Sequence, residues 1–303
     1  MLFSETIQNW DDWGRVFQSI PAFTPLVREI FRREGLPFAP LQNLTPGTNG
    51  VFRCGDLVVK VFFPRESGLD PEPDFRNEAA VCGHLTKLGV PVPKLLAQGL
   101  VRDKYDFYYL VTQFCPGREA GDWLPTASPR EKEFFARQLK ELLALVNRPA
   151  PGLIPPVDLR RRGRENPRLA HVAPALAEEL QARARAVDLA EPVLVHGDLT
   201  GENVLVDEKG RPVLIDWADA CLAPAWYELP PLALGLFQRD PLLLKLWAGE
   251  DREAFVQGVL DGLAVHDFGP DILRETAKEA GLPPFSSLEE VRRLLEQALA
   301  NRG

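Results

Sequence analysis

The hydrophobic positions of the chain change their spacing along its length. Residues 6 to 34 carry apolar side chains at helical spacing, interrupted by Pro21 and Pro25, which predicts two short helices. From about residue 38 to 63, short apolar or alternating runs are separated by PGTNG and CGD. This pattern is typical of three strands joined by turns.

A helix is predicted next, over about residues 74 to 88, and two more strands follow it. One strand lies near 96 to 101 and the other near 106 to 114, where the sequence reads DFYYLVTQF. The CPG at 115 to 117 ends this region. The first part of the chain is therefore predicted to form an antiparallel sheet with one inserted helix.

The second half of the chain is predicted to be mainly helical. Ser128, Pro129 and Glu131 form a helix start before EFFARQLKELLALV, and the last hundred or so residues have a similar pattern. Residues 193 to 217 hold the only convincing strand pair of this half. We therefore expect an α+β chain in two lobes, consisting of a helical segment at 1–37, a β-rich N-lobe at 38–115 and a mainly helical C-lobe at 116–303.

That strand pair, VLVHGDLTGENVLVDEKGRPVLIDW, carries polar side chains at the ends of its apolar runs. If Val206 lies opposite Val213, antiparallel pairing places Asn203 opposite Asp216, about one strand spacing apart. An amide oxygen and a carboxylate can share one cation, and Mg²⁺ needs only one or two protein ligands. The pattern therefore predicts a magnesium site.

Asp198 precedes Asn203 by five positions, in the loop that enters this hairpin. The spacing is that of the kinase catalytic loop H-R-D-x-x-x-x-N, whose Asp accepts the proton of the substrate hydroxyl. The alternative is that Asp198 and Asn203 are turn residues and that Asp216 caps the next segment. We expect His196, which follows an apolar run, to be buried and hydrogen-bonded to backbone rather than to act as a base.

The segments HGDLTGENVLV and VLIDWADA resemble the catalytic loop and the metal-binding segment of the aminoglycoside phosphotransferase and choline kinase family. These are small-molecule kinases with a bilobal protein-kinase-like fold, and the similarity in layout extends over residues 38 to 235. The resemblance implies that ATP binds between the lobes. It also implies that Asp198 is the catalytic base and that Asn203 and Asp216 are Mg²⁺ ligands.

The same resemblance implies a strand Lys that contacts the phosphates and a helix Glu that holds it. Lys60 interrupts the apolar run LVVKVFF, and Glu78 shares a helix face with Phe75, Cys82 and Leu85. A charge on an apolar surface is costly unless it is paired, so we expect Lys60 and Glu78 to form an ion pair. The alternative is that Lys60 lies on a sheet edge and extends its ammonium into solvent.

Two further segments are assigned by their place in the layout. The turn at 46–50 stands where this fold carries its phosphate-covering loop, and small residues let backbone N–H groups approach phosphates; an ordinary hairpin loop is the alternative. The expected nucleotide contacts here are Gly47, Thr48, Asn49 and Gly50. LVTQFCPG resembles the linker between lobes, which implies adenine contacts with the backbone C=O of Gln113 and N–H of Cys115.

Composition narrows the function without identifying it. Hydrophobic residues make up 45% of the chain and charged residues 26%, and the formal net charge is −8, which argues against a nucleic-acid-binding face. No signal peptide or membrane span is expected. The four cysteines lack a C-x-x-C pair, so neither zinc nor disulfides are expected and a reducing cytoplasm fits; they are Cys54, Cys82, Cys115 and Cys221.

The predicted reaction is transfer of the ATP γ-phosphoryl group to a hydroxyl of a small molecule, such as an aminoglycoside, an amino alcohol or a sugar. A catalytically silent nucleotide-binding scaffold is the alternative. A protein kinase is less favoured because HGD lacks the Arg of H-R-D and no A-P-E-like segment follows. The sequence leaves open the acceptor, the choice between ATP and GTP, and the oligomeric state.

Several features bear on the acceptor. The chain departs from the family pattern at Thr200-Gly201-Glu202 and at Glu228, where an Asp is common. Residues 222 to 303 hold 13 acidic and 8 basic residues, which indicates either solvated helix faces or an acidic pocket for a cation. The basic run at 160–164 is expected to be a solvated loop, with contact to an anionic substrate group as the alternative. Four aromatic residues either stack on a ligand or form core: Trp217, Trp226, Tyr227 and Phe237.

Overall fold

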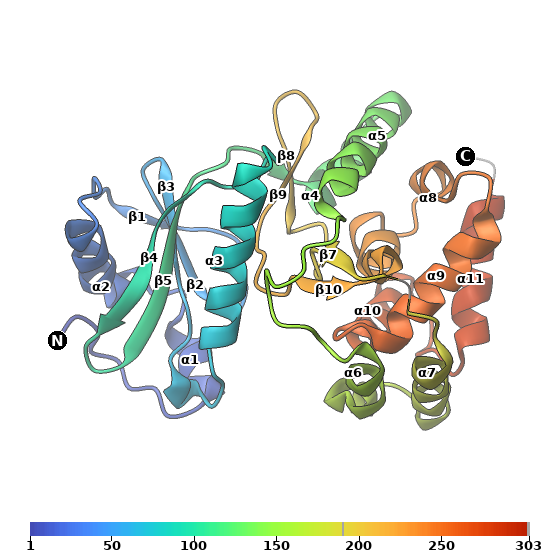
Figure 1. The fold of residues 1–303 in the computed structure, drawn as a ribbon, viewed down its shortest axis with the longest axis horizontal. Helices are drawn as coiled ribbons and strands as arrows, with labels where there is room; N and C mark the ends of the chain where they lie inside the picture. Colours follow the sequence, from blue (N-terminus) through green and yellow to red (C-terminus); the bar gives the residue numbers. More distant parts are fainter. Residues whose placement is uncertain (190, 302–303) are drawn as a thin grey trace. The chain divides into compact units, whose positions relative to one another are not determined.

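The chain folds into two units. The structure is a computed structural model that describes residues 1–189 and 191–301, and its contacts separate Met1–Pro116 from Gly117–Gly303 (Figure 1). Unit 1 contains α1 (Trp10–Val16), α2 (Ile20–Arg33), β1 (Leu41–Asn43), β2 (Gly50–Cys54), β3 (Leu57–Val61), a 3₁₀ turn at Arg65–Ser67, α3 (Glu72–Lys87), β4 (Leu95–Arg102) and β5 (Asp106–Gln113).

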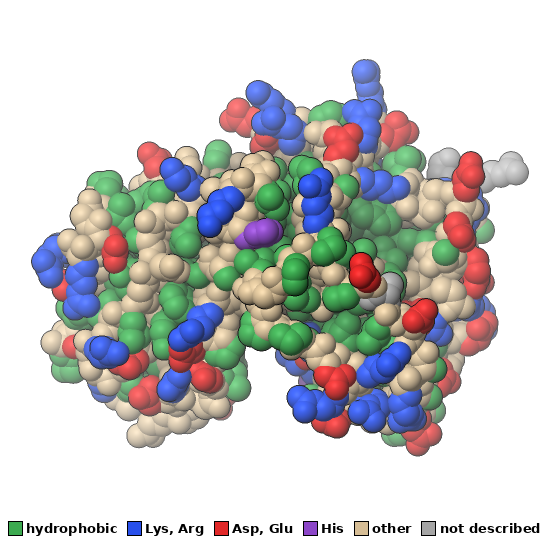
Figure 2. All heavy atoms as spheres, in the orientation of Figure 1, with side chains coloured by type: hydrophobic (Ala, Val, Ile, Leu, Met, Phe, Trp, Pro, Cys, Tyr) green, Lys and Arg blue, Asp and Glu red, His purple; other side chains and the backbone are tan. Residues whose placement is uncertain are grey.

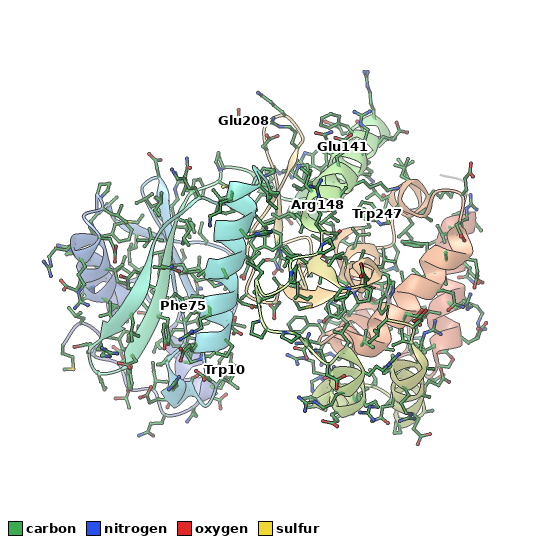
Figure 3. The ribbon with its side chains drawn as sticks, viewed as in Figure 1. Trp10, Phe75, Glu141, Arg148, Glu208 and Trp247 are labelled. Atoms are coloured by element: carbon green, nitrogen blue, oxygen red, sulfur yellow. The ribbon has the colours of Figure 1, made fainter. Side chains whose placement is uncertain are left out.

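Unit 1 is built on one antiparallel sheet with the strand order β1-β2-β3-β5-β4. The predicted sheet with one inserted helix is confirmed. Side chains alternate between the two faces of a strand, so the fully buried Val59 and Val61 join the core with α1 and α2, while Lys60 between them faces α3. Phe75 points from α3 toward the sheet and stacks on Tyr108, with ring centroids 4.8 Å apart (Figure 3).

The N-terminal helical segment packs into the core of this unit. Side chains from α1 and α2, including Trp13, Phe23 and Ile30, lie in the same hydrophobic cluster as the sheet. The two helices predicted over residues 6 to 34 are confirmed as α1 and α2, and the prolines do not break the second one. Pro21 lies in the first turn, where no N–H partner is lost, and Pro25 lies inside a helix that continues to Arg33.

Unit 2 is mainly helical. It contains β6 (Arg118–Glu119), α4 (Ala120–Trp123), 3₁₀ turns at Leu124–Thr126, Pro167–His171 (η3) and Ala225–Glu228 (η4), a π-helical turn at Pro231–Leu236, and the following elements: α5 (Pro129–Val146), α6 (Leu159–Glu165), α7 (Pro174–Ala186), β7 (Val193–Val195), β8 (Val204–Val206), β9 (Pro212–Leu214), β10 (Cys221–Ala223), α8 (Pro241–Ala248), α9 (Arg252–Val265), α10 (Gly269–Glu279) and α11 (Leu288–Ala300).

The helix start predicted at Ser128 is confirmed. The Ser128 side chain accepts from the Glu131 N–H, the Glu131 carboxylate accepts from the Ser128 N–H, and Pro129 opens α5. The basic run at 160–164 is helix α6 and not a loop. Asp158 caps this helix by accepting from the N–H of Arg161, so the run has a fixed backbone.

Residues 193–217 contribute three strands to two small sheets, where a single strand pair was predicted. β8 and β9 pair with each other and with β6 in a three-stranded sheet, and β7 pairs with β10 in a second sheet. Strands as short as β6 and β10 give almost no periodic signal in a sequence. β10 is important for the site because Cys221 lies opposite Val195, immediately before the loop that begins at His196.

The predicted register of the β8–β9 hairpin is wrong by one residue. Val206 pairs with Pro212, not with Val213, because the turn is shorter than expected. The N–H of Asp207 donates to the C=O of Arg211, and Gly210 adopts φ +76°, which closes a three-residue loop. Ile215 therefore bonds Asn203, its N–H donating to the Asn203 C=O at 3.0 Å, and Asp216 lies one residue beyond the predicted pair.

α9 is mostly buried, and its polar side chains Glu253, Gln257 and Asp261 lie along one face. Glycines let its neighbours approach closely: a Cβ on Gly262 would lie 2.5 Å from Pro230, and one on Gly163 of α6 would lie 2.2 Å from the carbonyl oxygen of Ala264. α6 is therefore seated tightly on α9. Among the described residues, no helix combines the length and apolar character needed to cross a membrane.

The aromatic cluster of unit 1 supports a stability prediction. The ring of Phe23 is fully buried and contacts those of Phe3, Trp13 and Phe52 at centroid distances of 5.1 to 5.9 Å. We expect Phe23→Ala to lower the free energy of unfolding by about 3–5 kcal/mol, because it leaves a cavity in the shared core. Urea denaturation followed by tryptophan fluorescence measures this. Arg32→Ala, on the exposed face of the same helix, should cost less than about 1 kcal/mol, and an equal effect of both would show that α2 is not part of the core.

Candidate active site

The loop between β7 and β8, residues 196 to 203, carries the predicted base. It turns sharply at Gly197, which has φ +82°, and a Cβ there would lie 2.0 Å from the carbonyl oxygen of Asp219. Only glycine fits such a close approach of two backbones. The loop is thereby pressed against the segment that follows β9, which brings Asp198 toward Asp216.

Asn203 and Asp198 are joined directly. The Asn203 side-chain amide donates to the Asp198 carboxylate at 2.8 Å and to the Asp198 backbone C=O at 2.9 Å. Both bonds use the NH₂ group, so the amide oxygen of Asn203 stays available as an acceptor or ligand. The predicted spacing of five residues has brought these two side chains together.

The position of Asp216 depends on a backbone conformation that the sequence did not predict. It follows β9 with φ +59°, a left-handed conformation that is uncommon for a residue other than glycine. This turn breaks the alternation of the strand, so the one-residue error in register does not send the carboxylate to the opposite face. The negative charge of Asp216 acts on Asp198, as the pKa of Asp198 shows.

The pKa of Asp198 is raised to about 7. Burial is the largest cause, followed by repulsion from Asp216; the hydrogen bond from Asn203 acts in the opposite direction, and the charge of Glu202 adds a smaller increase. Two acidic groups and an amide oxygen therefore lie together with too little positive charge. Oxygen donors of this kind suit Mg²⁺, which needs few protein ligands. No group of three or more His, Cys, Asp or Glu side chains suited to a metal occurs in the described part of the chain.

His196 has the structural role that the sequence predicts. Its side chain is fully buried, with Nε2 2.9 Å from the C=O of Ile215 and Nδ1 accepting from the N–H of Asp198 at 3.3 Å. The ring therefore carries its proton on Nε2 and connects the start of the loop with the end of β9. Trp217 packs on the ring at a centroid distance of 4.4 Å.

Glu228 holds the backbone at the start of this loop, a role that the sequence pattern did not predict. The side chain is buried, and Oε1 accepts from the backbone N–H of His196. Burial raises the pKa of Glu228 to about 7, although the N–H groups of His196 and Gly197 and the side chain of Asn147 favour the charged form. The signal in the sequence was an acidic residue among apolar ones in WYELPPL.

In unit 1, the predicted ion pair is present. Lys60 Nζ lies 2.7 Å from Glu78 Oε2, and both residues are 7% exposed. The strand and the helix thus satisfy two charges that would otherwise be buried in apolar surroundings. The alternative of an edge position is excluded, because Lys60 pairs with Val51 on one side and with Leu110 on the other.

The turn at 46–50 divides into an exposed and a buried part. Gly47 and Thr48 are exposed, whereas Asn49 and Gly50 are buried. The Asn49 side chain accepts from the N–H of Phe63 at 3.3 Å, and the Thr48 C=O accepts from the Trp13 indole at 2.8 Å. The Asn49 side chain thus holds the loop on the unit. Nucleotide contacts at Gly47, Thr48, Asn49 and Gly50 stay a prediction.

Gln113 and Cys115 lie at the end of β5. Gln113 is the last residue of the strand, and its N–H donates to the C=O of Lys94 at 2.9 Å. Cys115 is partly exposed, and its Sγ lies 4.0 Å from the Gln113 C=O, a weak contact. Backbone contacts to an adenine at these two positions stay a prediction.

A family model of the phosphotransferase enzyme family matches residues 47–276 of the chain. The chain belongs to this family. It is a small-molecule kinase of the phosphotransferase enzyme family, as the sequence predicts. The match includes Lys60, Glu78, Asp198, Asn203 and Asp216. It begins at Gly47, the second residue of the turn at 46–50.

Solved structures with the same fold include other members of the phosphotransferase family. The GDP complex of wild-type aminoglycoside 2'-phosphotransferase-IIIa is 18% identical, with a TM-score of 0.63 over 93% of this chain and 98% of that one. The streptomycin–ATP complex of APH(2")-IIa is 15% identical, with a TM-score of 0.58 over 78% and 86%. The apo form of a thermostable mutant of APH(4)-Ia is 14% identical, with a TM-score of 0.59 over 90% and 99%. The predicted protein-kinase-like fold is confirmed.

Among the aromatic residues considered for ligand stacking in this phosphotransferase, three belong to the core. Trp217, Tyr227 and Phe237 are each at most 1% exposed, while Trp226 is partly exposed. Gly201 has a comparable packing role: its C=O accepts from the N–H of Gly121 at 3.1 Å, and a Cβ on Gly201 would lie 2.7 Å from the Gly121 Cα. The departure at Thr200-Gly201-Glu202 thus brings the loop into close contact with α4.

The buried ion pair of unit 1 gives a second prediction. We expect Lys60→Met to lower the free energy of unfolding by about 3–5 kcal/mol, because the buried Glu78 carboxylate loses the ammonium that compensates its charge. The double variant Lys60→Met/Glu78→Leu should recover most of this loss, since both charges are then absent. Urea denaturation of the two single variants and the double variant gives the coupling energy. Additive losses would contradict an energetic link between the two residues.

Glu228 gives a prediction for the pH dependence of stability. Its pKa is higher in the folded protein, at about 7, than its usual value of 4.5, so the folded state binds the proton more tightly. The free energy of unfolding should therefore fall as pH rises from 4.5 to about 7. Asp198 adds a fall of the same sign.

We expect Glu228→Gln, which keeps an oxygen for the His196 N–H, to make this fall shallower. Denaturation midpoints measured across this pH range in the presence of a chelator test it. Glu279→Gln, at an exposed site of α10, is the matched control and should follow the wild type. A variant at Glu228 with the full wild-type pH dependence would contradict the prediction.

Proposed function

We propose that the chain transfers the γ-phosphoryl group of ATP to a hydroxyl group of a small molecule, with Asp198 as the catalytic base. The observation that carries the proposal is the direct bond from Asn203 to Asp198, with the carboxylate of Asp216 close enough to raise the pKa of Asp198. A carboxylate with a pKa near 7 accepts a proton more readily than an ordinary Asp.

In the proposed step, the acceptor oxygen forms a bond to the γ-phosphorus while the bond to the β–γ bridging oxygen breaks. Asp198 orients the acceptor hydroxyl and takes its proton, and ADP leaves with the electrons of the broken bond. Positioning and electrostatic stabilisation account for most of the rate in such reactions. Asp198 is held for this purpose by Asn203 and, through the loop backbone, by His196 and Glu228.

Asn203 and Asp216 are the residues that would hold Mg²⁺. Their side chains present an amide oxygen and a carboxylate next to a second acidic group, and this donor set fits the ion. Bound there, the ion would offset the negative charge of the phosphates. Lys60, kept in place by Glu78, is the proposed phosphate contact of unit 1, together with the backbone of Gly47 and Thr48.

The decisive experiment is to incubate the protein with ATP and a library of hydroxylated small molecules and to detect products that have gained one phosphoryl group by mass spectrometry. We expect Asp198→Ala to lower kcat by about 10²- to 10⁴-fold with little change in ATP affinity, because the base is lost and the nucleotide contacts stay. Glu208→Gln, at the exposed tip of the β8–β9 hairpin (Figure 3), should retain wild-type kcat.

Three results would contradict the proposal. Equal rates for the wild type and Asp198→Ala would remove Asp198 from the role of base. ATP binding without a phosphorylated product from any acceptor would favour a silent scaffold instead. A phosphorylated peptide or protein in place of a small molecule would indicate a protein kinase.

A further inference from the structure

The segment at the start of α6 and through η3 is unusually basic for this chain. Residues 159 to 171 contain five arginines and one glutamate, although the formal net charge of the chain is −8. Figure 2 shows Lys and Arg side chains close together, with a few acidic ones among them, over the end of unit 2 that carries α6 and α7. These arginines differ in whether they contact a carboxylate, a backbone carbonyl or a neutral side chain.

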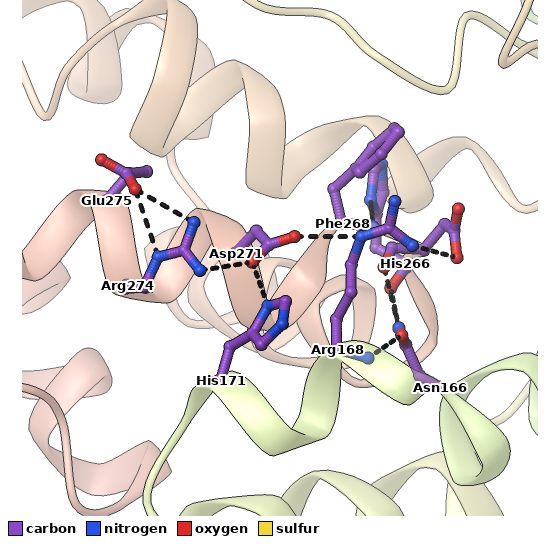
Figure 4. A network of polar contacts seen from close by, with 9 residues as sticks. Asn166, Arg168, His171, His266, Phe268, Asp271, Arg274 and Glu275 are labelled. Atoms are coloured by element: carbon purple, nitrogen blue, oxygen red, sulfur yellow. Dashed lines mark hydrogen bonds and ion pairs between the residues drawn. The ribbon is translucent and has the colours of Figure 1, made fainter. Parts of the chain in front are cut away.

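Most of the charge in this segment is already engaged. Arg168 lies 2.9 Å from Asp271 and 3.4 Å from Asp267, in a polar network that also includes His171 (Figure 4). Arg160 donates to the backbone C=O of Val187 at 2.9 Å. These arginines connect η3 with α10 and α6 with the end of α7, so their contacts are explained by the fold.

Arg162 is different. Its side chain is half-buried, and NH1 donates to the hydroxyl of Tyr227 at 3.1 Å. The thiol of Cys221 is its other close neighbour. No carboxylate in the described part of the chain forms an ion pair with Arg162, and Asp267, whose charge acts on it, is paired with Arg168 instead. Burial disfavours the charge on Arg162, whereas Tyr227, Cys221 and the more distant charge of Asp267 favour it. A carboxylate in direct contact, the usual partner of a buried guanidinium, is missing among the described residues.

The position of Arg162 is fixed by its neighbours. Gly163, the next residue, is pressed against α9, where a Cβ would lie 2.2 Å from the carbonyl oxygen of Ala264. α6 therefore cannot rotate to carry the guanidinium elsewhere without losing this contact. A charged group held in one place before a ligand arrives loses little entropy on binding it.

Arg162 is also close to the catalytic loop. Its neighbour Cys221 lies opposite Val195 in the β7–β10 pair. Val195 is three residues before Asp198, which is at most about 10 Å of chain. The guanidinium and the proposed base thus belong to the same region of unit 2, connected through the β7–β10 pair.

We propose that Arg162 binds an anionic group of the acceptor, a carboxylate or a phosphate, so that the acceptor is a hydroxylated anion. This inference rests on the proposed phosphotransfer and names the substrate class of the same site. A guanidinium fits carboxylates and phosphates because its N–H groups can form two parallel hydrogen bonds to their oxygens.

Much of the acidic charge in the C-terminal part is already paired with basic residues. Several of the acidic side chains form ion pairs with basic residues, which leaves their charge compensated. The pairs are Asp240–Lys132, Asp261–Arg183, Asp271–Arg168, Glu253–Arg292 and Glu279–Arg239. Many acidic side chains of residues 222–303 thus form ion pairs with arginines and lysines. This favours the prediction that these residues lie on solvated helix faces over the prediction of an acidic pocket for a cation.

The test uses acceptors that differ in charge but share a carbon skeleton. Galacturonate, galactose and galactosamine form one series, and glycerate, glycerol and glycerol phosphate form another that compares carboxylate with phosphate. The full chain is assayed with ATP and Mg²⁺ for phosphorylated product. We expect kcat/KM to be about 10- to 100-fold higher for an anionic member than for its neutral counterpart, the effect of a hydrogen-bonded charge pair.

Variants of Arg162 separate binding from a structural role. Arg162→Gln should remove the preference for the anion by raising KM with little change in kcat, and Arg162→Lys should keep part of it. Arg161→Gln, an exposed position in the same helix, should retain the wild-type preference. Melting temperatures of the variants show whether each is folded.

Three outcomes are informative against the inference. A wild-type preference for the neutral or cationic members would overturn it while leaving phosphotransfer intact. An equal loss on all three charge classes in both Arg162 variants would assign Arg162 a structural role. The absence of phosphorylated product from any acceptor would instead remove the phosphotransfer on which the inference rests.

Discussion

The hydrogen bond from the Asn203 amide to the Asp198 carboxylate is the contact on which the site depends. It connects the entry of the loop with the first residue before β8, so the loop cannot open without breaking it. It also partly offsets the cost of keeping two acidic groups close together in half-buried surroundings. The positive charge that this pair of acidic groups requires is what a metal ion would supply.

The backbone around this bond is arranged by constraints that leave little choice of residue. Gly197 is required by the approach of the Asp219 carbonyl oxygen, and Gly201 by the contact with α4. His196 and Glu228 then hold the loop through its backbone N–H groups and the Ile215 C=O. Buried ionisable groups are costly compared with apolar ones, so their presence here is explained by the position that they give to Asp198.

The same reasoning distinguishes the charges of this protein from one another. Lys60 and Glu78 compensate each other within unit 1, and Arg168 is compensated by Asp271 within unit 2. Arg162 donates to the neutral hydroxyl of Tyr227 and has no carboxylate in direct contact among the described residues. Its environment, and not the net charge of the chain, is the property that bears on the acceptor. Net charge describes the whole surface, whereas recognition depends on a few groups that have lost their water.

Much of the fold follows from local patterns. The alternation in LVVKVFF, the turn residues between the strands and the start of α5 at Ser128 each depend on near neighbours, and the structure has all of them. The pairing of Lys60 with Glu78 was also predictable, because each charge interrupts an apolar face and has few ways to be satisfied. The spacing of Asp198 and Asn203 placed them together in the same way.

Other features were decided only by tertiary contacts. The register of the hairpin depended on how Gly210 closes the turn, and the direction of Asp216 depended on a left-handed backbone that no sequence rule anticipates for Asp. The roles of Glu228 and Arg162 depended on segments brought beside them from 32 and 65 residues away along the chain. The sequence alone thus determined the elements and the chemical groups, because those follow from local periodicity and residue type. Which groups meet, and which charge has no carboxylate in direct contact, was determined by the tertiary structure, because packing joins residues whose separation in the sequence carries no signal.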